Sequence, residues 1–254
     1  MGIKGRLGSD SLILGVIMLL FCGCASEQRW GEKVDLRSGL VAWYTFDEGK
    51  GTVARDSAGG HNGVVHGATW TKGRIGGALD FDGPKDYVSV PDSPELNITG
   101  DLTIAAWVNF RKGGLDYDGS EKAIVTKCYS NGALNNPFDF RTSISIEPVL
   151  AMVRADEGSH ECLYSDKHIT LHSWHHVAVR VKDGAIDFYV DGVLMDKSWG
   201  APALKSRPTG NDFPLLIGAR SDGLFFNGLI DDVRIYNRAL TAGEIKALCA
   251  FAGK

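Results

Sequence analysis

Two pairs of closely spaced aspartates have the residue type that acid–base chemistry needs. Hydrolysis of a glycoside requires two carboxyl groups on either side of one bond, about 5–10 Å apart. Asp80 and Asp82 are followed at once by Gly-Pro, which favours a turn. Asp187 lies within a predicted strand, and Asp191, directly after that strand, precedes a glycine in a predicted hairpin turn. Since both pairs have a structural explanation, we expect a protein that is not an enzyme, with a divergent glycoside hydrolase as the weaker alternative.

Histidines that lie close together in the sequence suggest a metal site by number alone: His168, His172, His175 and His176. His175 and His176 are neighbours on a predicted strand, so their side chains face opposite sides. His168 and His172 would need helical spacing to act together, but the sequence around them is typical of a loop. The histidines therefore do not predict a zinc site.

Aromatic and polar residues that could bind a ligand gather in the two longest irregular stretches, residues 111–137 and 198–226. Sugar sites combine an aromatic platform with nearby hydrogen-bonding side chains, and loops on a rigid scaffold usually carry specificity. The candidates are Tyr117, Asp118, Tyr129, Asn131, Asn135, Trp199, Arg220 and Phe225. Taken singly, each is also compatible with packing or with a solvated loop.

Short strands must position these candidates, because apolar residues alternate with period two along most of the chain. In residues 102–110, for example, one face collects Leu102, Ile104, Ala106, Val108 and Phe110. Asp-Gly turns at 183–184 and 191–192 divide 174–181, 185–190 and 193–197 into a three-stranded meander. The other predicted strands cover 41–46, 78–81, 87–90, 123–128, 138–146, 149–153, 215–218 and 229–236.

One helix is predicted, near the C-terminus. Thr241 and Glu244 have the spacing of a capping box, and Ile245 and Leu248 continue one apolar face. The chain of 254 residues contains 32 glycines, roughly 13% against a usual level of about 7%. Many short strands with glycine-rich turns and no βαβ alternation predict an all-β, antiparallel, two-sheet sandwich with a short C-terminal helix.

The N-terminus predicts export. Lys4 and Arg6 precede a short apolar stretch at 12–21 and small residues, which is typical of a signal peptide, here residues 1–23. The following Gly23 and Cys24 resemble the cleavage and lipidation positions of a bacterial lipobox, and ordinary signal cleavage nearby is the alternative. We expect a lipid on Cys24, a tether at 24–38 and one domain at 39–254, in an exported protein of the bacterial cell envelope: an outer-membrane lipoprotein, or one in the periplasm or on the extracellular face.

Three cysteines remain in the predicted domain, at Cys128, Cys162 and Cys249. Outside the cytosol two thiols can pair, and we favour Cys128 with Cys162 because Cys249 lies in the predicted helix; three free thiols are the alternative.

The formal net charge is −4 at pH 7, so the chain lacks the basic excess of a nucleic-acid-binding protein. The only membrane association we expect is through the lipid anchor.

Seven sequence blocks, in order, resemble a laminin-G-like domain of the concanavalin A-like lectin/glucanase jelly-roll type. They are LVAWYTFDEG (40–49), DSAGGHNG (56–63), GALDFDG (77–83), LTIAAWV (102–108), WHHVA (174–178), FYVDG (188–192) and GLIDDVRIYNRAL (228–240). The resemblance implies a two-sheet jelly roll, often with a structural calcium ion and a glycan- or protein-binding role. Such folds host many unrelated functions, so the resemblance does not identify a ligand.

A structural Ca²⁺ is expected from this resemblance, because Ca²⁺ takes six to eight oxygen ligands from carboxylates, amides and main-chain carbonyls. The family pattern favours Asp47, Asp56, Asn62, a carbonyl near Gly63, and Asp232. Neighbouring strand residues point to opposite faces, so only one residue of the Asp231-Asp232 pair is expected to serve. The alternative for Asp47 and Asp56 is that they cap turns.

The expected function is that of an exported, lipid-anchored binding module that recognises carbohydrate at the cell surface or outside it. A protein-binding or structural role in assembly of the cell envelope is the alternative. The expected partner is therefore a carbohydrate or a surface protein.

Overall fold

The computed structural model describes residues 34–112, 121–129, 136–143, 148–155, 160–195, 198–200 and 208–252 of the chain. They all belong to one compact unit that extends from Val34 to Lys254. In this part of the chain no helix has the length and apolar character needed to span a bilayer.

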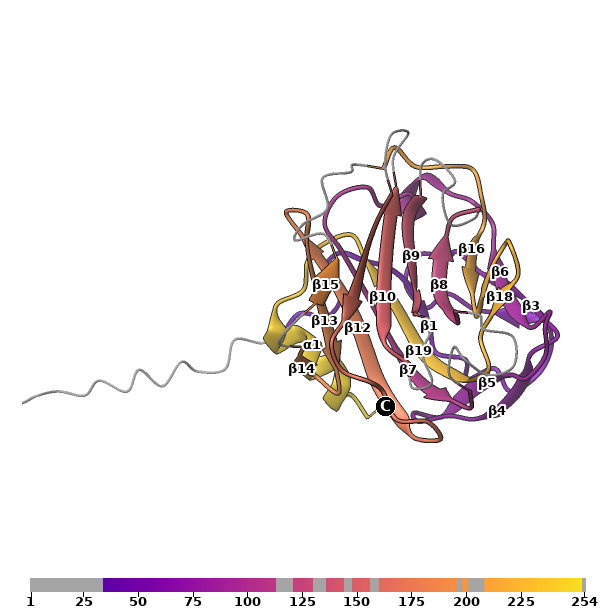
Figure 1. Cartoon of the computed structure of the whole chain (residues 1–254). Coiled ribbons are helices and arrows are strands. Elements are labelled where there is room, and N and C mark those ends of the chain that lie inside the picture. Colours follow the sequence, from indigo (N-terminus) through magenta and orange to yellow (C-terminus); the bar gives the residue numbers. More distant parts are fainter. Residues whose placement is uncertain are drawn as a thin grey trace, which may run out of the picture. The chain divides into compact units, whose positions relative to one another are not determined.

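Two large antiparallel sheets make up this unit (Figure 1). The eight-stranded sheet has the order β14-β13-β12-β7-β19-β5-β4, and β1 also pairs with β19. Its strands are β1 (Leu40–Tyr44), β4 (Thr69–Lys72), β5 (Gly77–Phe81), β7 (Leu102–Phe110), β12 (Trp174–Lys182), β13 (Ala185–Val190), β14 (Val193–Leu194) and β19 (Gly228–Tyr236).

The nine-stranded sheet has the order β15-β11-β10-β9-β8-β16-β6-β3-β2. Its strands are β2 (Val53–Ala54), β3 (Gly63–His66), β6 (Tyr87–Val90), β8 (Ala123–Lys127), β9 (Asn136–Thr142), β10 (Leu150–Ala155), β11 (His160–Ser165), β15 (Ser198–Gly200) and β16 (Leu215–Ile217). A separate hairpin joins β17 (Ala219–Arg220) to β18 (Leu224–Phe225), and a short 3₁₀ helix covers Pro94–Leu96. The predicted all-β sandwich is confirmed.

The core lies between the two sheets and follows the predicted alternation. Ile104 and Phe110 of β7 are fully buried in the same apolar cluster as Phe138 and Phe140 of β9. The predicted meander is confirmed as β12, β13 and β14. Its two Asp-Gly turns have positive φ at both residues, such as 49° at Asp183 and 81° at Gly184.

The helix α1 (Ala242–Ala250) covers the outer face of the eight-stranded sheet, beside β13 and β14 in Figure 1. The predicted capping box is present: Thr241 Oγ1 accepts from the Glu244 amide, and the Glu244 carboxylate accepts from the Thr241 amide. Ile245 and Leu248 of α1 belong to the same buried cluster as Tyr236 of β19 and Ala105 of β7. Because α1 covers this outer face, β7 is buried on both of its faces.

The predicted Cys128–Cys162 disulfide is wrong, because both residues are free thiols in the structure. Cys162 lies on β11 and Cys128 directly after β8, and strands β10 and β9 separate them in the sheet. Three strand spacings amount to about 14 Å, whereas the Cα atoms of a disulfide lie roughly 4.4–6.8 Å apart. Cys249, on α1, is also a free thiol.

Candidate functional site

Two residues of the predicted calcium set organise a loop instead of facing an ion. The Asp56 carboxylate accepts four main-chain hydrogen bonds: Oδ1 from Trp43 (2.8 Å) and Ala58 (2.9 Å), and Oδ2 from Gly59 (2.9 Å) and His61 (3.0 Å). The side-chain oxygen of Asn62 in turn accepts from the Asp56 amide at 2.9 Å. Both side chains therefore cap the loop that leads from β2 into β3.

The other members of the predicted set lie elsewhere. Gly63 is paired with Ala54 between β3 and β2. Asp232 Oδ1 accepts from the Trp43 indole at 2.6 Å and is ion-paired with Arg234 at 3.1 Å. In the described ranges no three His, Cys, Asp or Glu residues form a group that could hold a metal ion. The predicted donors do not fit one calcium shell, and calcium stays a prediction.

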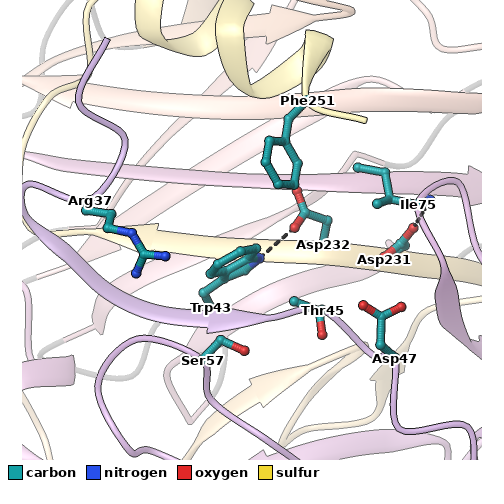
Figure 2. A pocket seen from close by; sticks show the side chains of 9 residues that line it. All are labelled: Arg37, Trp43, Thr45, Asp47, Ser57, Ile75, Asp231, Asp232 and Phe251. Carbon is teal, nitrogen blue, oxygen red and sulfur yellow. Dashed lines mark hydrogen bonds between the residues drawn. The ribbon is translucent and has the colours of Figure 1, made fainter. Parts of the chain in front are cut away.

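A pocket of about 300 Å³ opens beside the C-terminal end of α1, and we call it the acidic pocket (Figure 2). Its walls come from β1, the segment after it, the turn between β4 and β5, β19 and the end of α1. The lining residues are Arg37, Trp43, Thr45, Asp47, Ser57, Ile75, Asp231, Asp232 and Phe251. Of the predicted calcium ligands, Asp47 and Asp232 share this pocket.

Both Asp231 and Asp232 line the acidic pocket, which corrects the expectation that they face opposite sides. The pairing of β19 with β7 shifts register between Asp231 and Arg234, as at a β-bulge. Asp232 adopts a φ of 48°, in the left-handed region that non-glycine residues rarely occupy. A bulge re-aims side chains, so the period-two rule does not apply at this point of the strand.

The carboxylate of Asp232 is ion-paired with Arg234, whereas no ion pair of Asp231 is present among the described residues. The Arg234 guanidinium lies 4.3 Å from the Trp43 ring centroid and 4.4 Å from that of Phe251, besides its ion pair with Asp232. The Asp231 side chain is buried; its Oδ2 accepts from the Ile75 amide at 2.8 Å, while its Oδ1 has no hydrogen-bond partner. Burial raises the pKa of Asp231 to about 7, against the Ile75 hydrogen bond, which lowers it.

A second hollow, the Arg220 groove, lies over the outer face of the nine-stranded sheet and has a volume of about 370 Å³. It is lined by Tyr87, Ser89, Pro214, Leu216, Ala219, Arg220, Ser221 and Phe225. Two of the predicted ligand-binding residues, Arg220 and Phe225, therefore share one site. A third, Tyr129, is close by, because the Ser221 hydroxyl donates to its carbonyl, and its ring stacks on Phe213.

The remaining candidates of the loop prediction cannot be placed in the same way. Tyr117, Asp118, Asn131 and Asn135 lie outside the described residues, as do Cys24 and the N-terminal segments. Trp199 belongs to β15, where its backbone pairs with Tyr164 of β11.

Buried charges that the sequence prediction missed hold Arg220 in place. Its guanidinium donates to Asp139 Oδ2 at 2.8 Å and to both carboxylate oxygens of Asp222, at 2.7 and 2.9 Å. Arg141 lies beside Asp139 at 3.6 Å and is ion-paired with Glu121. The sequence signal for this cluster was the alternation of apolar and charged residues in Phe-Asp-Phe-Arg at 138–141.

The carboxyl groups of Glu121 and Asp139, which lie behind the groove, are therefore paired with arginines. Burial raises the pKa of Glu121, and the charge of Arg141 opposes that shift. Asp139 contacts both arginines, through the same carboxylate oxygen. These ion pairs hold the side chains beneath the Arg220 groove in place.

Comparison with known proteins identifies relatives of this fold. The Laminin_G_3 family model, described as "Concanavalin A-like lectin/glucanases superfamily", matches residues 82–246. The adhesion G-protein coupled receptor V1 of Danio rerio is 29% identical over 179 residues. That match covers 67% of this chain and 3% of the receptor.

Similar solved structures include domain 4 of AbnA, a GH43 extracellular arabinanase from Geobacillus stearothermophilus, in complex with arabinotriose. Its TM-score is 0.62 at 19% identity, with 84% of this chain and 99% of that chain covered. The binding domain of Paraclostridial Mosquitocidal Protein 1 has a TM-score of 0.66 at 20% identity, covering 85% and 52%. Trypanosoma rangeli sialidase in complex with sialic acid has a TM-score of 0.63 at 18% identity, with 88% of this chain and 35% of that chain covered. At identities of 18–20%, these similarities show that the fold is shared and nothing more.

Proposed function

Because the chain belongs to the concanavalin A-like lectin/glucanases superfamily, we propose that it is a non-catalytic module that binds carbohydrate in the Arg220 groove. The observation that carries the proposal is the combination of aromatic and polar side chains in this groove. A similar domain of an arabinanase is described in complex with arabinotriose, which agrees with the choice of carbohydrate as ligand.

Two half-buried aromatic rings, Tyr87 and Phe225, provide the apolar surface on which the CH face of a sugar packs. Tyr87 is held by a stacked contact with His66, at 4.4 Å between ring centroids. The His66 ring is in turn hydrogen-bonded to Ser89, at 2.9 Å. The platform is therefore fixed before a ligand arrives, which lowers the entropic cost of binding.

Polar groups for sugar hydroxyls lie beside this platform. A guanidinium carries five N–H donors, and the described hydrogen bonds of Arg220 use three of them. Because Asp139 and Asp222 fix the plane of the guanidinium, its remaining donors have a defined direction. The hydroxyl groups of Ser89 and Ser221 line the same groove. This arrangement suits a neutral sugar with neighbouring hydroxyl groups.

The test is a glycan array with the exported form of the chain, followed by titration calorimetry on the hits. Tyr87→Ala and Phe225→Ala should each weaken binding about tenfold, since loss of one aromatic contact costs roughly 1.4 kcal/mol. Phe251→Ala is the matched control, because it removes a half-buried aromatic ring from the acidic pocket instead. Equal affinity in all three variants would exclude the groove. An array without hits, together with capture of a defined surface protein, would favour the protein-binding or assembly role.

The proposed location is the cell envelope, with a signal peptide at residues 1–23 and a lipid on Cys24. Mass spectrometry of the membrane-bound chain should show an acylated N-terminal cysteine, and Cys24→Ala should release the chain into the soluble fraction. A membrane-bound Cys24→Ala variant would contradict the anchor without affecting the proposed ligand site.

A further inference from the structure

The guanidinium of Arg220 faces the Arg220 groove, but carboxylates of the protein already pair with it. Among the described residues that line the groove, no other carries a charge. The Asp222 carboxylate occupies one edge of the guanidinium, with Oδ1 at 2.7 Å from Nε and Oδ2 at 2.9 Å from Nη2. Asp139 Oδ2 accepts from Nη1 at 2.8 Å. Each nitrogen of the guanidinium therefore has a carboxylate partner.

The ion-pair cluster beneath the groove has an excess of negative charge. Arg141 shares Asp139 with Arg220, at 3.6 Å, and is also ion-paired with Glu121. The Glu121 carboxylate lies 4.0 Å from Arg220 Nη1 as well. Two arginines thus face three carboxylates, the third being Asp222. The cluster carries one formal negative charge when all of its groups are ionised.

Asp222 is the member of the cluster that an incoming ligand meets first. Its side chain is 32% exposed, whereas that of Asp139 is 1% exposed. Asp222 lies in the tight turn between β17 and β18, where the Gly223 amide donates to the Arg220 carbonyl at 3.0 Å. The same hairpin carries Phe225 of the proposed sugar platform. One short segment therefore supplies an aromatic ring, the arginine and the acid that neutralises it.

A carboxylate on a sugar would need the guanidinium edge that Asp222 occupies. Arginine binds carboxylates most strongly through two parallel N–H···O hydrogen bonds from one edge. Asp222 closes the edge formed by Nε and Nη2, and Nη1 faces Asp139 and Glu121. An acidic sugar would then lose water from its carboxylate without gaining a counter-charge, which is unfavourable. A sugar that has only hydroxyl groups does not incur this penalty.

We propose that the Arg220 groove selects neutral sugars over acidic ones, and that Asp222 determines this selectivity. The inference rests on the proposed function of the groove as a carbohydrate site. An arginine considered alone would suggest the opposite preference, because guanidinium groups are common partners of carboxylates. Discrimination between ligands often depends on a repulsive element in the site, and here Asp222 is that element. Removing its charge while keeping its shape should free the outer edge of Arg220 for an acidic sugar.

The test is a glycan array that holds neutral oligosaccharides together with versions of them that carry a uronic or sialic acid, followed by titration calorimetry on the hits. The unaltered chain should bind the neutral members at least tenfold more tightly than their acidic versions. In Asp222→Asn the affinity for acidic members should rise at least tenfold relative to the neutral ones, because a charge-assisted pair with Arg220 becomes possible. Asp222→Glu retains the charge and should retain the preference for neutral sugars.

Asp183→Asn is the matched control, because it removes one negative charge from an exposed hairpin turn of the other sheet. Its ratio of neutral to acidic binding should equal that of the unaltered chain. Equal affinity of the unaltered chain for both kinds of glycan would overturn the inference and leave the proposed function standing, as would an unchanged ratio in Asp222→Asn. If neither the unaltered chain nor Asp222→Asn binds any glycan, the proposed function fails and the inference fails with it. Should Asp222→Asn not fold, Asp222→Ser takes its place in the comparison.

Discussion

His176 predicts a measurable loss of stability in mild acid. The imidazole lies on β12, 1% exposed, with its edge against the Trp107 ring at 5.4 Å between centroids. Within the part of the chain that the structure describes, its Nδ1 has no hydrogen-bond partner. Burial lowers the pKa of His176 to about 4; the charge of Arg234 adds to this shift and that of Asp191 opposes it.

The size of the effect follows from linkage between protonation and folding. The ordinary pKa of 6.5 and the folded value of about 4 differ by about 2.5, and each unit corresponds to about 1.36 kcal/mol, or roughly 3.4 kcal/mol in total. Below pH 6.5 the unfolded chain binds a proton at His176 that the folded chain refuses, so the free energy of unfolding falls as the pH falls. Between pH 7 and pH 5 the expected loss is about 2 kcal/mol, and the loss is complete below pH 4.

The assay is urea unfolding of the unaltered chain and its His176→Gln variant at pH 7, 6 and 5. Glutamine does not titrate, so the variant should lose about 2 kcal/mol less than the unaltered chain between pH 7 and pH 5, whatever its stability at pH 7. Comparing the two proteins cancels other groups, including Asp231, whose raised pKa acts in the opposite direction over this range. Parallel pH profiles for the two proteins would refute the reasoning, since His176 would then be protonated in the folded state as readily as in the unfolded one.

Three further substitutions test individual contacts through the free energy of unfolding in urea. Gly218→Ala should destabilise by at least about 2 kcal/mol, because Gly218 has a φ of 80° and a Cβ would lie 2.4 Å from the Phe81 ring; a neutral result would mean that the ring moves freely. Asp56→Ala should cost about 2 kcal/mol, because four main-chain donors lose their acceptor, and a loss below 0.5 kcal/mol, roughly half of one such hydrogen bond, would contradict its capping role. Thr241→Ala should cost about 1 kcal/mol by removing the side-chain acceptor of the Glu244 amide, and Thr241→Ser, which keeps the hydroxyl, should cost much less.

The strands with clear alternation could be predicted from the sequence, and those without it could not. In β7 the residues that the period-two pattern selects pack against the other sheet, whereas Ala105 on the opposite face is buried under α1, which the alternation did not predict. The strand β3 (Gly63–His66) was missed because it follows a glycine-rich segment and its sequence, Gly-Val-Val-His, does not alternate apolar with polar residues. Short edge strands such as β2 form through their neighbours, and local sequence carries little information about such pairing.

The candidate sites depend on contacts between distant segments, which explains what the sequence prediction missed. Arg220 and Phe225 could be selected as candidates because aromatic and charged residues stand out in a predicted loop, and the structure places both in one groove. The sequence predicted Tyr87 only as part of a strand. Its place in the groove results from the pairing of β6 with β16, which the sequence did not predict. At Asp231 a bulge in β19 overrides the alternation on which the prediction depended.

The acidic pocket and the Arg220 groove belong to different sheets, and this separation predicts how the expected calcium binding and the proposed glycan binding relate. The outer face of the eight-stranded sheet is covered by α1 through Ile245 and Leu248, and the acidic pocket opens at the edge of that cover. The Arg220 groove lies on the nine-stranded sheet, where it is lined by Ser89, Ser221 and the guanidinium of Arg220, which Asp139 holds in place. A structural Ca²⁺ held by the predicted ligands Asp47 and Asp232 would lie in the acidic pocket and would not contact a sugar in the Arg220 groove. Chelation should lower the Tm yet leave glycan affinity unchanged below the melting transition, which distinguishes this arrangement from a lectin that binds its sugar through the metal.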